Sequence, residues 1–499
     1  MTRNSRGRST SISPRRVATA LDLRRALDRA EASAEPAPTG LASRHAGKLP
    51  PQQPPFLRDL PREGEVYEPK QKVTRELKEI IDDNYYGAAF EHAIATVSAQ
   101  RVPELDRIKT LDQFYFYVDT LVTWIPEIRV WDWDGVALHE RTVYLRITQF
   151  YYYFNQPALE ALQSPIAPIK GAQLSPISRW LRDFAIEWGG FLDTPESNKY
   201  LDSFKYAPEY AWQDYEKPPT EYATFNEFFA RTFKDIEVQR PVAAPGDDRV
   251  ITFPAESTFV GQWAVSTPVG EPLPAPPSIV VKHIEWTIDE LLADSQHGAA
   301  FQGGLFCHSF LNTYDYHRMH APVAGKILEA RFIPGQVYLE VDLAEQGEAG
   351  ANGDLARAVI PQRYLDAQDA TGYQFVQCRG LLVLESAVGK VAVLPMGMAQ
   401  VSSVVFVTPK ADGQRPIVLT PDEKRGLDYH QQVELVNKKL QSALVGKRLA
   451  KGEMFSFFQF GGSDCVMVFE RKASVNVTAT VNVHYPVRSQ YATANVNLR

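Results

Sequence analysis

The stretch FQFGGSDCV, residues 458–466, decides how the rest of this sequence is interpreted. Its apolar residues predict a β-strand, but two glycines and a serine interrupt the pattern. The structural explanation is a bulge or a tight strand corner, because glycine weakens a strand interior. The functional explanation is a strained backbone in which the Ser463 hydroxyl attacks the Gly462 carbonyl and cleaves the chain. The tripeptide alone leaves both explanations open.

The region around this stretch, from residue 236 onward, has the texture of a β-rich domain. β-branched runs alternate there with turns containing Gly and Pro, which predicts short strands. Strands are expected at VITFPA (250–255), SIVVKHIEW (278–286), GKILEARFI (325–333), QVYLEVDL (336–343), FVQCRGLLVLE (375–385), VAVLPMGM (391–398), QVSSVVFVT (400–408) and SDCVMVF (463–469).

Residues 64–235 show helical spacing instead. Ser175 and Pro176 form an N-cap and first-turn pair, and large apolar residues then recur every three and four positions. The aromatic runs FYFY (114–117) and FYYYF (150–154) are expected to pack helices together. The predicted fold class is therefore α+β, with a helical domain at 64–235 and a β-rich catalytic domain at 236–499.

Residues 1–63 are predicted to be a basic, Pro-rich and disordered tail. Its Arg- and Ser-rich start also fits a mitochondrial transit peptide, although acidic residues are present. The expected location is the cytoplasm, with the mitochondrion as the alternative.

Composition limits the classes of partner. The 499 residues carry a formal net charge of -7, which argues against nucleic acid as the main partner. Three scattered cysteines, Cys307, Cys378 and Cys465, predict neither a disulfide framework nor a metal site. No apolar run is long enough to cross a bilayer as a helix, so only peripheral membrane contact is left open, as is a homo-oligomer.

A histidine pair and a carboxylate are further candidates for chemistry. His317 and His320 lie in YDYHRMHAPVAGKI (314–327), and residues three apart face the same way only on a helical turn. No third ligand lies at a spacing that would suggest zinc. Glu256 lies in FPAES (253–257), a short motif that by itself indicates no function.

In order and spacing, these motifs together resemble the phosphatidylserine decarboxylase family. The resemblance covers roughly residues 220–472 and includes FNEFFARTF (225–233), FPAES, YHRMHAPVAG and FGGS. The stretches at 180–201 and 395–403 are similar to the soluble branch that contains fungal L-tryptophan decarboxylase. The segment 446–460 resembles a lipoyl-domain hairpin, so barrel-sandwich (lipoyl-like) character is expected.

The resemblance implies a role for five residues. Ser463 matches the serine that becomes a pyruvoyl cofactor, and Gly462 matches the residue left at the new C-terminus. His320 matches the base that activates the serine, Glu256 the acid that orients that base, and His317 the proton donor in decarboxylation. Cleavage would give chains 1–462 and 463–499. No metal is implied.

The implied activity is that of a self-processing, pyruvoyl-dependent decarboxylase, a carboxy-lyase. A free aromatic L-amino acid, bound as a Schiff base, is the expected substrate and small-molecule partner. The first alternative is a phosphatidylserine decarboxylase that makes phosphatidylethanolamine. The second is an unprocessed, non-catalytic member, because Asp464 stands where the family usually has Thr or Ser and its charge would oppose an oxyanion beside it.

Overall fold

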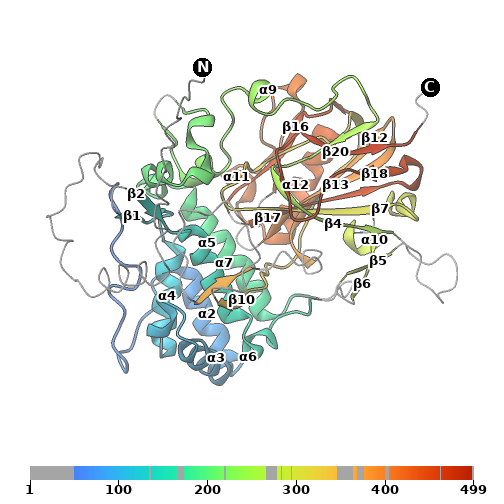
Figure 1. Ribbon diagram of the computed structural model, residues 1–499. Helices are drawn as coiled ribbons and strands as arrows, with labels where there is room; N and C mark the ends of the chain where they lie inside the picture. Colours follow the sequence, from blue (N-terminus) through green and yellow to red (C-terminus); the bar gives the residue numbers. More distant parts are fainter. Residues whose placement is uncertain are drawn as a thin grey trace, which may run out of the picture.

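A computed structural model describes residues 50–133, 136–166, 173–218, 221–265, 278–281, 284–293, 295–345, 363–367, 376–398, 404–460 and 462–496. The described chain contains helices and antiparallel sheets, so the predicted α+β class is confirmed. The helices α2 to α7 gather on one side of the molecule, and the β-rich part lies on the other (Figure 1).

The helical side is held together by aromatic rings. Its helices are α2 (Lys72–Asp83), α3 (Gly87–Ala99), α4 (Leu111–Val122), α5 (Thr142–Phe154), α6 (Pro157–Glu160) and α7 (Pro176–Leu192). The Ser175 side chain caps α7 by accepting from the Ser178 backbone N–H at 3.1 Å, as predicted. Both aromatic runs lie in helices, and Phe150 of α5 stacks on Phe184 of α7 at 4.3 Å between centroids. Their predicted packing role is therefore confirmed.

Two parts of this side differ from the expected helical pattern. Strands β1 (Val130–Trp133) and β2 (Val136–His139) pair within it. The helical pattern ends with the short helix α8 (Phe225–Phe229), whereas α9 (Ile236–Gln239) lies past the predicted boundary and contacts the β-rich side, where Arg488 donates to the Ile236 carbonyl at 3.2 Å. The 3₁₀ turns of the described chain are η1 (Leu105–Arg107), η2 (Pro195–Asn198), η3 (Leu201–Tyr206), η4 (Pro208–Tyr210), η5 (Trp212–Asp214), η6 (Gly298–Phe301), η8 (Lys410–Asp412) and η9 (Arg471–Ala473).

Residues 50–63, predicted to belong to a disordered tail, pack against the helices. The Phe56 ring lies 5.7 Å from that of Tyr117, and the fully buried Leu57 accepts from Arg107 at 2.9 Å. A proline-rich segment has no repeating period, but two apolar residues are enough to dock it onto a formed core. The rest of the predicted tail, residues 1–49, lies outside the described residues. The cellular location therefore stays a prediction.

The β-rich side is built on an eight-stranded antiparallel sheet. In spatial order its strands are β15 (Arg448–Leu449), β9 (Gly325–Ile333), β12 (Arg379–Ser386), β13 (Gly389–Met398), β17 (Gly462–Phe469), β7 (Leu305–Leu311), β4 (Ser257–Ala264) and β19 (His484–Tyr485). Three-stranded sheets join β14 (Val404–Phe406), β16 (Met454–Phe458) and β8 (Arg318–His320), and β18 (Val475–Val477), β20 (Gln490–Ala494) and β3 (Val250–Thr252). Of the two-stranded pairs, β5 (Ser278–Val281) joins β6 (Ile284–Thr287), whereas β10 (Asp342–Glu345) joins β11 (Arg363–Asp366) and lies on the helical side against α5, where the Tyr144 hydroxyl donates to Asp366 at 2.7 Å (Figure 1).

Barrel-sandwich character is not seen in the described strands. The large sheet ends at β15 on one edge and at β19 on the other, so these strands do not close into a barrel. The segment 446–460 is not a hairpin, because β15 pairs with β9 whereas β16 pairs with β8 and β14. The two halves of the supposed lipoyl hairpin therefore belong to different sheets.

Helices also occur within the β-rich side, where none was predicted. The longest is α12 (Tyr429–Leu444), and the others are α10 (Ile288–Leu291) and α11 (Pro421–Lys424). The Asn437 side chain of α12 binds the backbone N–H and C=O of Phe332 in β9 at 2.7 and 2.9 Å. This contact fixes α12 against the large sheet, far along the sheet order from β17.

Strand β17 lies in the interior of the sheet and separates two cores. Alternation along a strand sends successive side chains to opposite faces. Cys465 and Met467 join the core that extends into the helical side, whereas Val466 and Val468 pack in a smaller core with α10. Ser463 and Asp464 begin this alternation, so their side chains face different cores.

Candidate active site

Ser463 is a buried serine near the start of β17. Its residue is 0% exposed, and its Oγ lies 3.2 Å from Nδ1 of His317. The cross-strand partners are Gly397 of β13 and Leu311 of β7. Because Gly397 has no side chain, the strand beside Ser463 adds no bulk on that side. A serine bound to a histidine, away from bulk water, is the arrangement that activates a hydroxyl for attack.

The His317 ring is oriented by packing. It stacks on Phe229 of α8 with 3.8 Å between centroids and 19° between planes, and the Phe458 ring meets its edge. The backbone carbonyl of His317 accepts from the Phe458 N–H at 2.9 Å, which ties this residue to β16. Elements from both sides of the molecule thus set the direction of the ring.

The same environment keeps His317 uncharged. Burial lowers the pKa of its imidazole well below the usual value, the positive charge of Arg231 adds to this, and the carbonyls of Thr313 and Asn312 partly offset it. A neutral imidazole has a ring nitrogen free to accept a proton. His317 can therefore act as the base for the Ser463 hydroxyl at neutral pH.

His320 lies on the other side of its strand. The helical turn that would make the two histidines face the same way is not present: His320 ends strand β8, and residues three apart on an extended chain face opposite ways. Its Nδ1 donates to the Gly452 carbonyl at 2.8 Å, and Nε2 lies 3.2 Å from the Tyr316 hydroxyl. Burial lowers its pKa to about 3. Both nitrogens are thus engaged away from Ser463, and the role of base implied for His320 stays a prediction.

Glu256 belongs to a third network. It lies between β3 and β4, 7% exposed, and binds Arg240 with Nε at 2.8 Å. It also accepts from the Val487 N–H at 3.1 Å. The link between FPAES and the histidine strand is through the backbone, from the N–H of His320 to the Pro254 carbonyl at 2.7 Å. The structure therefore brings Ser463 and His317 together but separates them from His320 and Glu256.

Asp464, the departure from the family pattern, is paired with a histidine that the sequence analysis missed. Its Oδ1 lies 3.0 Å from Nε2 of His308 in β7, and both side chains are fully buried. Burial raises the pKa of Asp464, and His308 partly offsets this. The carboxyl lies on the opposite strand face from the Ser463 hydroxyl. The only signal for His308 was a polar residue inside the apolar run LFCHSFL (305–311).

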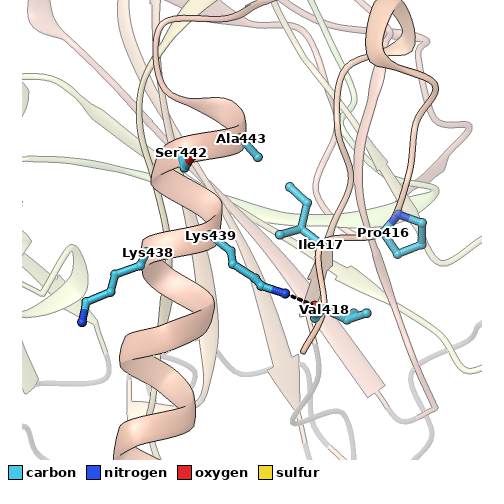
Figure 2. Close-up of a pocket in the computed structure, with 7 residues that line it drawn as sticks. All are labelled: Pro416, Ile417, Val418, Lys438, Lys439, Ser442 and Ala443. Carbon is cyan, nitrogen blue, oxygen red and sulfur yellow. Dashed lines mark hydrogen bonds between the residues drawn. The ribbon is translucent and has the colours of Figure 1, made fainter. Parts of the chain in front are cut away.

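A surface groove elsewhere does not belong to this site. It runs between α12 and the segment before α11, where Lys439 Nζ donates to the Val418 carbonyl at 3.2 Å (Figure 2). Its lining residues are Pro416, Ile417, Val418, Lys438, Lys439, Ser442 and Ala443. Helix α12 packs on β9, and two strands separate β9 from β17. The described residues also place no group of three or more His, Cys, Asp or Glu side chains where it could hold a metal ion.

The family model and the relatives that match this chain carry the same family name. The family model described as phosphatidylserine decarboxylase matches residues 225–489, more than half of the chain, including Glu256, His317, His320 and Ser463. The "phosphatidylserine decarboxylase proenzyme 3" of Schizosaccharomyces pombe is 26% identical over 59% of this chain and 24% of its own length. The proenzyme of Fusobacterium nucleatum is 23% identical over 59% of this chain and 76% of its own length. That of Myxococcus xanthus is 38% identical over 23% of this chain and 38% of its own length.

These names correct one prediction from the sequence. A free amino acid was expected as the small-molecule partner, but the relatives are named for a phospholipid, phosphatidylserine. The resemblance to the tryptophan decarboxylase branch rested on segments at 180–201 and 395–403. The first lies outside the matched region, and residues 399–403 of the second lie outside the described residues.

Proposed function

This chain belongs to the phosphatidylserine decarboxylase family, whose members are pyruvoyl-dependent carboxy-lyases, and we propose that it converts phosphatidylserine to phosphatidylethanolamine. The observation that carries the proposal is the buried Ser463 hydroxyl, 3.2 Å from a neutral His317 and directly after Gly462. The chain covers about a quarter of one relative's length and about three quarters of another's.

The first step is cleavage of the chain by its own residues. His317, in place of the His320 that the resemblance implies as base, takes the proton of Ser463 because it is the histidine 3.2 Å from that hydroxyl. The hydroxyl oxygen bonds to the Gly462 carbonyl carbon, and the carbon–nitrogen bond breaks as the nitrogen gains a proton. Loss of the Ser463 α-proton then expels the Gly462 carboxylate and leaves a dehydroalanine. Water hydrolyses this group, releases ammonia and leaves a pyruvoyl at position 463.

The residues present suit such a group. When formed, a pyruvoyl supplies an electron-accepting carbonyl to a substrate amine. Burial of position 463 shields it from bulk water, and His317 lies where a proton can be held or returned. Pairing of β17 with both β13 and β7 would keep Ser463–Phe469 in the sheet, and so the second fragment attached, after cleavage.

The position of the Asp464 side chain is compatible with self-cleavage. A carboxylate facing the scissile carbonyl would oppose the developing oxyanion. Here the carboxyl lies on the other strand face and is hydrogen-bonded to His308. This placement supports an active protein over the unprocessed, non-catalytic alternative.

Access to a lipid substrate is proposed to be peripheral. No helix in the described part of the chain is long and apolar enough to cross a membrane.

The decisive experiment combines mass and activity. The purified protein should appear on a denaturing gel as fragments 1–462 and 463–499, the second with a blocked N-terminus, and Ser463→Ala should stay whole. Vesicles containing phosphatidylserine should release CO2 with the cleaved protein only. An intact wild-type chain would contradict self-cleavage. CO2 from free tryptophan but not from vesicles would contradict the lipid substrate.

A further inference from the structure

Two arginines tie the segment after α8 to the segment that carries His317. Arg231 donates through Nη2 to the carbonyls of Tyr314 and Asp315, the second at 3.1 Å. Arg318 donates through Nε to the carbonyls of Ala230 and Arg231, at 2.7 and 3.3 Å. Each arginine therefore binds the backbone of the segment that carries the other. We call this pair of contacts, between 230–231 and 314–318, the arginine clasp.

The clasp encloses the stacked pair of Phe229 and His317. Phe229 immediately precedes the first clasp segment, and His317 immediately precedes Arg318. The guanidinium of Arg231 also lies over the Tyr215 ring at 4.2 Å, and Arg231 is only 2% exposed. A ring held by stacking alone can slide in its plane, whereas four hydrogen bonds to fixed carbonyls limit that motion.

We propose that Arg231 and Arg318 are positioning residues, which hold the His317 ring within reach of the Ser463 hydroxyl. The inference rests on the proposed self-cleavage for its effect on rate, but the geometry of the clasp does not depend on it. A small displacement of a reacting group is enough to lower the rate by orders of magnitude. Loss of the clasp should therefore affect the cleavage rate more than the free energy of unfolding.

Arg231 has a second, electrostatic effect. Its Nε and Nη1 have no hydrogen-bond partner among the described residues, and its charge lowers the pKa of His317 in addition to burial. The other elements around the ring present Phe458 and Ser463, which carry no charge. The charged side chains nearest along the chain are Asp315, which pairs with His484 at 2.9 Å, and Arg318. Removing the Arg231 charge should therefore make His317 easier to protonate.

A matched control separates positioning from general stabilisation. Arg379 is equally buried and also binds only backbone carbonyls, those of Leu291, Gln377 and Glu290, at 2.8, 2.9 and 2.8 Å. It does so on the side of the sheet that faces α10. Arg379→Lys should lower stability without changing the pH dependence of cleavage.

The test follows cleavage of freshly synthesised precursor in a cell-free system between about pH 5 and 8, the range in which histidines titrate. Arg231→Lys keeps the charge but loses the fork, so cleavage should slow about tenfold with an unchanged acid limit. Arg231→Gln should slow it similarly and move the acid limit to higher pH. Equal slowing by Arg231→Gln and Arg379→Lys, with no shift in the acid limit, would overturn the proposal.

A second readout does not need cleavage. In the Ser463→Ala protein with ¹⁵N-labelled histidine, the NMR signals of His317 should change at a higher pH after Arg231→Gln, and not after Arg379→Lys. Unchanged His317 signals in a folded Arg231→Gln protein would refute the clasp. If the wild-type precursor stays whole, the proposed function fails and this measurement still decides the role of Arg231.

Discussion

Ser463 and Asp464 are neighbours in the chain, yet strand β17 sends them to two differently built faces. On one face Ser463 meets His317, whose ring is held by an aromatic residue of the helical side. On the other face Asp464 meets His308 of the adjacent strand. The first contact joins distant segments and is poised for attack, whereas the second is a buried pair within one sheet. The comparison teaches that a side chain next to a scissile bond in the sequence affects cleavage only if it points to the same strand face as the nucleophile.

The largest effect is expected from removing the nucleophile. Ser463→Ala should abolish cleavage and CO2 release, because no other hydroxyl can attack the Gly462 carbonyl from that position. Ser456→Ala is the control: its hydroxyl is buried and has no partner in the described part of the chain, and it lies in β16. Normal cleavage of Ser456→Ala and none of Ser463→Ala, seen by intact mass, fits the comparison. Cleavage in both variants would break it.

The next largest effect should be a difference in cleavage rate between variants of His317 and His308. His317→Gln should slow cleavage by about 10²–10⁴, the usual contribution of a general base. His308→Gln should slow it far less, because His308 pairs with Asp464, whose carboxyl lies on the opposite strand face from the Ser463 hydroxyl. Timed gels of the two precursors measure this. Equal slowing would mean that the two faces are not separated as the geometry indicates.

The pH dependence sharpens the same contrast. Burial lowers the pKa of His317, so the ring stays neutral, and able to act as a base, as pH falls through the usual histidine range. Cleavage should therefore hold its rate at about pH 6.5 and decline only at lower pH. A rate that halves near pH 6.5 would show an ordinary, exposed base.

A smaller effect, mainly on stability, is expected at Glu256. Glu256→Gln removes a charge-assisted contact to a half-buried arginine and should cost about 2 kcal/mol in urea unfolding. The cleavage rate of the same protein tests the role implied for Glu256 through His320. Slowing equal to that of His320→Gln would support that role, and normal cleavage would leave Glu256 a purely structural residue.

The smallest effect should come from Asp464. Asp464→Asn keeps a partner for His308 but removes a carboxyl whose pKa burial raises. A raised pKa means that the wild-type protein loses stability as pH rises through that pKa, and the variant does not. Relative to the wild type, the variant should therefore be more stable at neutral pH than at acid pH, with nearly normal cleavage. A block of cleavage would show that the carboxyl serves the reaction after all.

Local signals predicted much of the fold. Ser175 and Pro176 mark the start of α7 because a cap depends on adjacent residues alone. The strand at 463–469 and its interrupting glycine and serine were recognisable for the same reason. QVYLEVDL was less successful, since only its end belongs to a strand, β10.

What sequence could not predict depends on distant partners. His317 and His320 face apart because β16 recruits residues 318–320 into a sheet. Helix α12 has a modest apolar face and is held to β9 by Asn437, a polar contact without a sequence pattern. His308 becomes significant only when β7 is placed beside β17. The candidate site was thus predicted as a set of residues, but not as a geometry.

The interior position of β17 also sets an order of events. Ser463 gains its histidine only when residues 317, 397 and 463, far apart in sequence, have met in the assembled sheets. An unfolded or partly folded chain lacks that encounter and cannot cut itself. The appearance of two fragments would then report folding, because cleavage begins only after the protein has reached its native state.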